Sequence, residues 1–70
     1  MSHHALEAAI LTLLLARHPA PVHAEELARA FAGDDWHSAV AALEVDGALH
    51  REGRLHLPTR AAVRVSRLLE

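Results

Sequence analysis

The fold is decided in the stretch Val40-Ala41-Ala42-Leu43-Glu44-Val45-Asp46-Gly47-Ala48-Leu49, where the spacing of the apolar residues changes. Before the glycine, apolar residues recur with the period of a helix, and glycine is common just beyond a helix end. After it, apolar residues fall at the alternating positions Leu49, Leu55 and Leu57, which is typical of strands. The sequence therefore predicts a helix that leads directly into a β-hairpin.

The register of this hairpin is predicted from the same leucines. A three-residue loop, Glu52–Arg54, is needed to place Leu49 and Leu57 on one face of the two strands. That register also pairs His50 with His56, so we expect both histidines to lie together on the outer face.

The paired histidines raise the question of a metal site. His50 and His56 could bind a metal with help from His37 or a carboxylate, because imidazole nitrogens are good zinc ligands. The chain has seven histidines in 70 residues, however, and a biased composition accounts for that number without a metal. No spacing fixes a third ligand. We therefore expect no metal and no other cofactor.

Three helices are expected before the hairpin. They cover residues 4–18, 24–32 and 35–46. A short strand is expected at Val22, Asp34 is a suitable N-cap for the third helix, and Gly33 makes the tight connection of a helix-turn-helix. The residues expected to face the core are Leu6, Ile10, Leu13, Leu14, Leu27, Ala28, Phe31, Trp36, Ala39, Val40 and Leu43.

A fourth helix is expected over residues 60–69, with Thr59 as its N-cap. Its apolar residues fall on one side at helical spacing, and its arginines fall on the other. The side expected to face the core carries Ala61, Ala62, Val65, Leu68 and Leu69, and the opposite side carries Arg60, Arg64 and Arg67.

Length and composition indicate a single domain over residues 1–70, with a flexible terminus at residues 1–4. Cysteine is absent, which excludes disulfides and thiolate metal sites. No apolar run reaches the roughly 18 residues of a membrane span, and the start of the chain lacks the features of an export signal. We therefore expect a cytoplasmic protein that does not enter a membrane.

Charge is distributed unevenly along the chain. Residues 1–47 carry two arginines and seven carboxylates, a net charge of −5, whereas residues 48–70 carry five arginines and two carboxylates, a net charge of +3. An anionic partner is therefore expected to contact the C-terminal third of the chain.

The order of helix, short strand, helix, helix, hairpin and helix resembles that of the winged helix-turn-helix proteins. The segment Pro21-Val22-His23-Ala24-Glu25-Glu26-Leu27-Ala28 is similar to the entry into that family's second helix, and residues 40–49 are similar to its recognition helix running into the wing. The resemblance covers residues 5–58. It implies an α+β, mostly α fold with a three-helix core, a helix-turn-helix over 24–47, a β-hairpin wing over 48–58 and a C-terminal helix over 59–70.

Most bacterial proteins of this kind bind DNA as dimeric transcriptional regulators. The resemblance therefore implies that the helix over residues 35–46 contacts the major groove of double-stranded DNA and that the wing contacts its backbone or minor groove. His37 and Ser38 lie on the outward side of that helix and could form hydrogen bonds to bases. The helix contains none of the residues that chiefly read base edges, which are Arg, Lys, Asn and Gln.

Phosphate contacts are expected from arginines beyond that helix. Arg51 and Arg54 lie at the hairpin tip, and Arg60 and Arg64 extend the basic surface into the last helix. The alternative interpretation of the arginines in the last helix is an ordinary solvated helix face.

A homodimer is expected from the first helix. Leu11 and Leu15 point away from its core-facing side, so we expect these two residues and Leu69 to form a symmetric interface. An alternative function is a protein-protein interaction module without DNA binding, in which the surface around Ala41 and Val45 contacts a protein partner. The acidic helix-turn-helix favours this alternative.

Catalytic motifs are absent from the sequence. It contains no cysteine nucleophile, no glycine-rich phosphate loop and no HExxH pair. Ser38 directly follows His37, and adjacent positions of a helix do not face each other. We therefore expect no catalytic residues and no enzyme activity.

Overall fold

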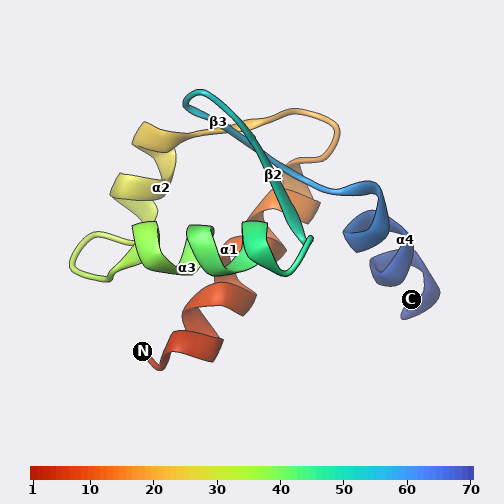
Figure 1. The fold of residues 1–70 in the computed structure, drawn as a ribbon, viewed down its shortest axis with the longest axis horizontal. Helices are drawn as coiled ribbons and strands as arrows, with labels where there is room; N and C mark the ends of the chain where they lie inside the picture. Colours follow the sequence, from red (N-terminus) through yellow and green to blue (C-terminus); the bar gives the residue numbers. More distant parts are fainter.

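Four helices and a three-stranded antiparallel sheet make up the protein, and the computed structural model describes all of residues 1–70. In chain order the elements are α1 (His3–Arg17), β1 (Val22–His23), α2 (Ala24–Ala30), α3 (Trp36–Val45), β2 (Leu49–Glu52), β3 (Leu55–Pro58) and α4 (Arg60–Leu68) (Figure 1). The fold is thus α+β and mostly helical, as expected. All four expected helices are present, with ends within two residues of the expected ones.

The core lies where α1 packs against α3 and β3. On α1 it includes Leu6, Ile10 and Leu14, which follow one another along one face of the helix. A single cluster of buried apolar residues comprises Leu6, Ile10, Leu14, Val22, Leu27, Phe31, Ala39, Val40, Leu43 and Leu49.

Three residues that were expected in the core, Leu13, Ala28 and Trp36, are not fully buried. Trp36 and Leu13 are half-buried and pack against the cluster, which agrees with a core role for the tryptophan. Ala28 is exposed, so its expected inward position is wrong. The short helix α2 reaches the core only through Leu27 and, just beyond its end, Phe31.

Side-chain caps determine where the helices begin. Ser38 N–H donates to Asp35 Oδ1 over 3.3 Å, so Asp35 caps α3 in place of the expected Asp34. Asp34 belongs instead to the turn after α2, because its N–H donates to the carbonyl oxygen of Phe31 over 3.0 Å. The expected cap of α4 is confirmed, since Ala62 N–H donates to Thr59 Oγ1 over 3.2 Å.

The hairpin has a tighter turn than the expected loop Glu52–Arg54. Strand pairs join Leu49 to Pro58, His50 to Leu57, Arg51 to His56 and Glu52 to Leu55. Only Gly53 and Arg54 remain in the turn. Gly53 has a φ of +60°, and glycine at the first of two turn positions fits a type II′ hairpin.

This register corrects the faces predicted for the hairpin. A shift of one residue turns every side chain of a strand to the opposite face. His56 and Pro58 are therefore buried, whereas Leu55 is exposed and Leu57 is half-buried. The expected pairing of His50 with His56 is wrong, because His50 lies opposite Leu57 and is exposed.

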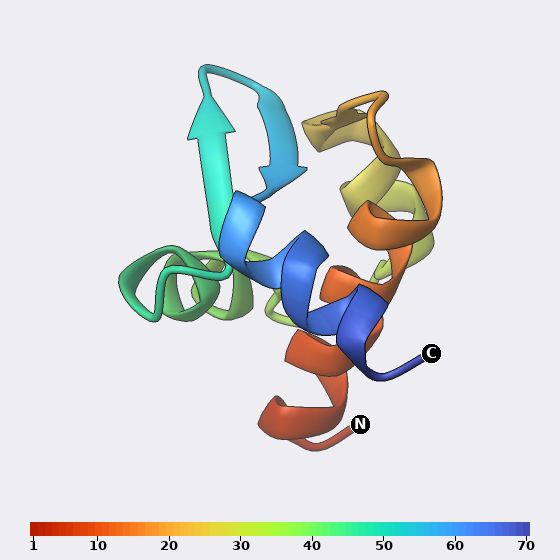
Figure 2. The same cartoon turned by 90° about the vertical axis from the view of Figure 1, so that its right-hand side faces the viewer.

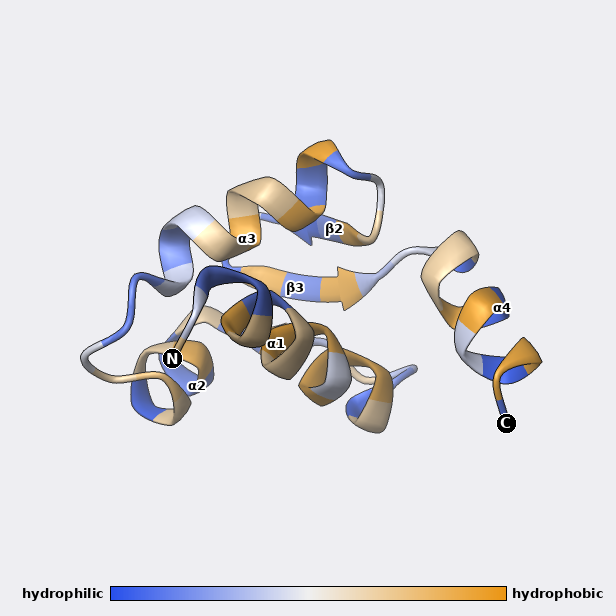
Figure 3. Ribbon diagram, turned by 90° about the horizontal axis from the view of Figure 1, so that it is seen from below, coloured by the Kyte–Doolittle hydropathy of each residue, from blue (hydrophilic) through white to orange (hydrophobic).

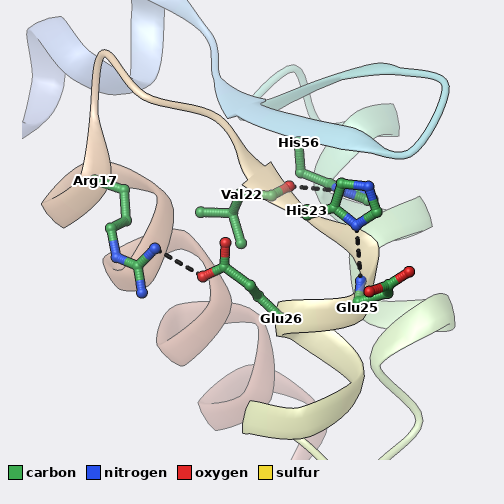
Figure 4. A network of polar contacts seen from close by, with 6 residues as sticks. All are labelled: Arg17, Val22, His23, Glu25, Glu26 and His56. Carbon is green, nitrogen blue, oxygen red and sulfur yellow. Dashed lines mark hydrogen bonds and ion pairs between the residues drawn. The ribbon is translucent and has the colours of Figure 1, made fainter.

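His56 is a buried member of the central strand, since β3 lies between β1 and β2. Its Nδ1 lies 3.2 Å from the carbonyl oxygen of Val22, the residue opposite it on β1 (Figure 4). A carbonyl oxygen can only accept, so Nδ1 carries the proton and donates. Burial lowers the pKa of His56, and the hydrogen bond to Val22 opposes that shift only in part. The ring is therefore neutral near neutral pH.

Helix α4 differs from the other helices because none of its residues is buried. It lies at one end of the molecule, beyond the base of the hairpin (Figures 1 and 3). Val65, Leu68 and Leu69 are 54%, 72% and 82% exposed, so the expectation that the apolar side of this helix faces the core is wrong. The other three helices and the sheet already enclose the core. None of the helices is long and apolar enough to cross a membrane.

Candidate binding surfaces

The outward side of α3 is exposed as the sequence predicted. His37, Ser38, Ala41 and Val45 are all accessible. His37 stacks on Trp36 with ring centroids 3.7 Å apart, which limits the orientations of its ring. Contacts from this side of α3 to a partner would therefore come from one imidazole, one hydroxyl and small apolar groups.

A hollow of about 240 Å³ separates α3 from the hairpin. His37, Ala41 and Glu44 line it from α3, and Arg51 and Arg54 line it from the hairpin. The structure thus brings together the proposed base-contacting histidine and both arginines of the hairpin tip. We call this region the α3–hairpin surface.

Each arginine of the α3–hairpin surface lies near a glutamate. Arg51 Nε is 3.5 Å from Glu44 Oε1, and Arg54 Nη2 is 3.7 Å from Glu25 Oε1. All four side chains are at least one-third exposed, so these ion pairs contribute little stability and exchange readily for other contacts. They nevertheless reduce the positive charge that the surface presents to an anion.

The hairpin tip lies against α2 instead of projecting freely. Ala24 N–H, at the start of α2, donates to the carbonyl oxygen of Arg54 over 2.8 Å. His23 Nδ1 accepts from Glu25 N–H over 3.3 Å and caps the same helix, while Arg17 forms a 2.7 Å ion pair with Glu26 (Figure 4). The position of Arg54 is thus tied to the start of α2, whereas Arg51 lies within β2 opposite His56.

Asp35 adds negative charge at the start of α3. Hydrogen bonds from the side chain and the backbone N–H of Ser38 lower the pKa of Asp35. The carboxylate therefore stays ionised well below neutral pH. Ser38 is already engaged by this cap, and an anionic partner is repelled at this end of the helix.

Arg60 and Arg64 do not extend the basic surface of the hairpin tip, contrary to expectation. The tip lies beside α2, whereas α4 follows the base of the hairpin at the other end (Figure 1). These two arginines and Arg67 line a separate hollow together with His18, the residue that ends α1. His18 was not predicted as a site residue, because no local sequence pattern indicates which distant helix a residue contacts.

Leu11, Leu15 and Leu69, expected at a dimer interface, line one groove of about 440 Å³ between α1 and α4. The groove is mainly apolar. It is completed by Asp46, Gly47, Ala48, Ala61, Ala62, Val65 and Ser66. We call it the apolar groove. Ala48 and Val65 were missed as members of this surface, because their proximity to α1 depends on the tertiary fold.

The histidines are dispersed across the structure. No group of three or more His, Cys, Asp or Glu side chains is arranged to hold a metal ion. His50 Nε2 lies 3.1 Å from Glu52 Oε1 at the surface, and His56 is in the core.

Comparisons of the chain with protein-family models, with curated proteins and with solved structures found no match.

Proposed function

We propose that the chain is a winged-helix domain that binds double-stranded DNA as a small homodimeric transcriptional regulator. The proposal is supported by the order of elements and by a sheet in which β1 joins the hairpin that serves as the wing. The observation that carries it is the α3–hairpin surface, where His37 of α3 and both tip arginines line one hollow.

In this proposal α3 contacts the major groove and the hairpin contacts the backbone beside it. His37 supplies hydrogen bonds to base edges, and Ser38 Oγ can still accept one while its hydroxyl donates to Asp35. Arg51 and Arg54 supply phosphate contacts. On binding, phosphates replace Glu44 and Glu25 as the partners of these arginines. Arg60 and Arg64 lie at the base of the hairpin and are not required for this contact.

The second copy is proposed to pack on the apolar groove. Exposed apolar side chains of α4 lie at or beside the groove, and burial of such a surface favours association. A two-fold axis through this region makes the contact self-complementary. It would also present two α3–hairpin surfaces to two half-sites of DNA.

The acidic residues around α3 repel phosphates and weaken binding to DNA, so the assay for DNA binding begins at low salt. A mobility-shift assay on a random duplex, repeated over a range of salt concentrations, measures the number of phosphate contacts from the salt dependence of affinity. Binding that weakens steeply with salt supports the proposal. No binding at the lowest salt would contradict it.

A protein-protein interaction module without DNA binding is the second candidate function. Two observations favour it: Glu44 and Glu25 lie beside the tip arginines, and Val45 on α3 is 87% exposed. In this alternative the side of α3 around Ala41 and Val45 contacts a protein partner. Both candidates act by binding and without catalysis.

A further inference from the structure

Three arginines of α4 lie on one side of the helix without a carboxylate partner. Arg60, Arg64 and Arg67 have the spacing i, i+4 and i+7, so their side chains leave the same side of the helix. Each arginine of α1 and of the hairpin lies within 3.7 Å of a glutamate oxygen, but these three form no ion pair. Guanidinium groups remain protonated at any ordinary pH, so three positive charges persist here.

These arginines line a hollow of about 720 Å³ between α4 and the end of α1. His18 lines it from α1 and Pro58 from β3, so the polar groups come from elements far apart in the sequence. We call it the basic hollow. Figure 2 views the molecule from the side on which α4 lies in front of the other elements.

No acidic residue lines the basic hollow. Glu70 lines a smaller adjoining hollow that shares His18 and Arg67, but it forms no ion pair with either. These arginines do not contribute to the core, because no residue of α4 is buried. Their charge is therefore available to a ligand.

We propose that the basic hollow binds a small phosphate compound that carries two or more negative charges. A guanidinium group donates paired hydrogen bonds to the oxygens of a phosphate group. Three guanidinium groups neutralise more negative charge than a ligand with a single carboxylate carries. The volume falls within the range of about 300–1,000 Å³ that is usual for small-molecule sites. His18 adds a ring N–H that can donate to another oxygen.

This site is separate from the α3–hairpin surface. The basic hollow follows the base of the hairpin, whereas the proposed DNA contacts lie at its tip. The proposal therefore does not depend on DNA binding.

The test is a titration of the full chain with inorganic pyrophosphate at about 0.1 M ionic strength, where the Debye length is about 10 Å, monitored by calorimetry and by backbone amide shifts. We expect saturable binding, with the largest shifts at His18 and along α4. Arg64→Ala should weaken binding about tenfold, as expected for the loss of one charge-assisted hydrogen bond.

The matched control is Arg29→Ala, which removes the same charge from an exposed arginine on α2 that also forms no ion pair. We expect this variant to change the affinity for pyrophosphate by less than about twofold, because Arg29 does not line the basic hollow and its exposed charge is screened by salt. Because both arginines are exposed, circular dichroism should give identical spectra for the two variants.

Several results would overturn the proposal. No saturable binding of pyrophosphate, or equal weakening by Arg64→Ala and Arg29→Ala, would leave only unspecific attraction of anions. Equal binding of malonate would refute the preference for phosphate. Loss of duplex affinity in Arg64→Ala, with no pyrophosphate binding by the unmodified chain, would assign the arginines to nucleic acid instead.

Discussion

The hydroxyl group of Thr59 donates a hydrogen bond to the backbone carbonyl oxygen of Gly47 over 2.7 Å. Thr59 Oγ1 also accepts from Ala62 N–H over 3.2 Å, and Thr59 N–H donates to the carbonyl oxygen of Ala48 over 3.0 Å. One residue thus both caps α4 and ties it to the turn between α3 and β2. Few other contacts hold this helix, because none of its residues is buried.

We predict that Thr59→Val, which keeps the branched shape but removes the hydroxyl, destabilises α4 by about 1–2 kcal/mol. The loss should be local, so amide hydrogen exchange in α4 should become faster while exchange in α1 is unchanged. Thr12→Val is the matched control, because Thr12 Oγ1 donates to the Ala8 carbonyl oxygen over 2.7 Å at an exposed position. Equal exchange of α4 in both variants would contradict the prediction.

The second prediction concerns acid and His56. Burial lowers the pKa of His56 below its ordinary value of 6.5, so the unfolded chain binds the proton more tightly than the folded one. The free energy of unfolding should therefore fall as pH falls below 6.5 and should level off below the folded pKa. Urea unfolding at pH 7, 6 and 5 measures this dependence.

His56→Gln should flatten that pH dependence, because an amide does not titrate and can still donate to the Val22 carbonyl oxygen. His50→Gln, at an exposed position on β2, should leave the pH dependence as in the unmodified chain. If the two variants respond alike to pH, the effect does not arise from the buried ring.

The third prediction concerns DNA. Replacing Arg51 and Arg54 with alanine should weaken binding to all sequences and reduce the slope of log affinity against log salt by about 2, or roughly 0.9 for each lost phosphate contact. Changing Glu44 and Glu25 to glutamine should do the opposite and strengthen binding, because these carboxylates compete for the arginines. Mobility shifts over several salt concentrations measure both effects.

A different result would contradict the predicted role of Arg51 and Arg54. An unchanged salt slope, with binding lost on replacing His37 and Ser38, would show that α3 supplies the main contacts. Arg29→Ala again serves as the control for charge, since it lies on α2 outside the α3–hairpin surface.

The fourth prediction concerns the homodimer. Analytical ultracentrifugation at tens of micromolar should give a dimer, because an interface of standard size is expected to be occupied at about that concentration. Changing Leu11 and Leu15 together to glutamate should abolish it, but both are half-buried and the change could also unfold the chain. Leu69→Glu avoids this difficulty, because Leu69 is 82% exposed.

Leu69→Glu should therefore give a folded monomer, with the dissociation constant raised at least about tenfold. Val45→Glu is the matched control, since Val45 is also highly exposed but lies outside the apolar groove. A monomeric unmodified chain, or equal dissociation of both variants, would refute this interface.

The helices were predictable from the sequence because their signals are local. Apolar spacing and caps such as Thr59 act within one or two turns of the chain. The register of the hairpin was not predictable in this way. In the observed register His56 pairs with Val22, 34 residues away, and Gly53 takes the first position of a two-residue turn. A leucine was therefore expected where a histidine is buried.

The candidate sites likewise combine features that the local sequence predicts with features that depend on the tertiary fold. Exposure of His37 and Ser38 follows from helix periodicity and was predicted. The contribution of His18 to the basic hollow, and the separation of Arg60 and Arg64 from the hairpin tip, depend on how distant elements pack. An amphipathic helix such as α4 also does not specify in its own sequence what covers its apolar side.

Gly47, which accepts the hydrogen bond from Thr59, has a φ of +78°, and an added Cβ would meet no atom within 4 Å. The requirement at this position is therefore one of chirality and not of space. L-alanine would be strained there by about 1–2 kcal/mol, whereas its mirror image, D-alanine, prefers this backbone conformation. A synthetic chain with D-alanine at position 47 should be about 0.4–1 kcal/mol more stable than the natural chain, because its unfolded state has fewer conformations.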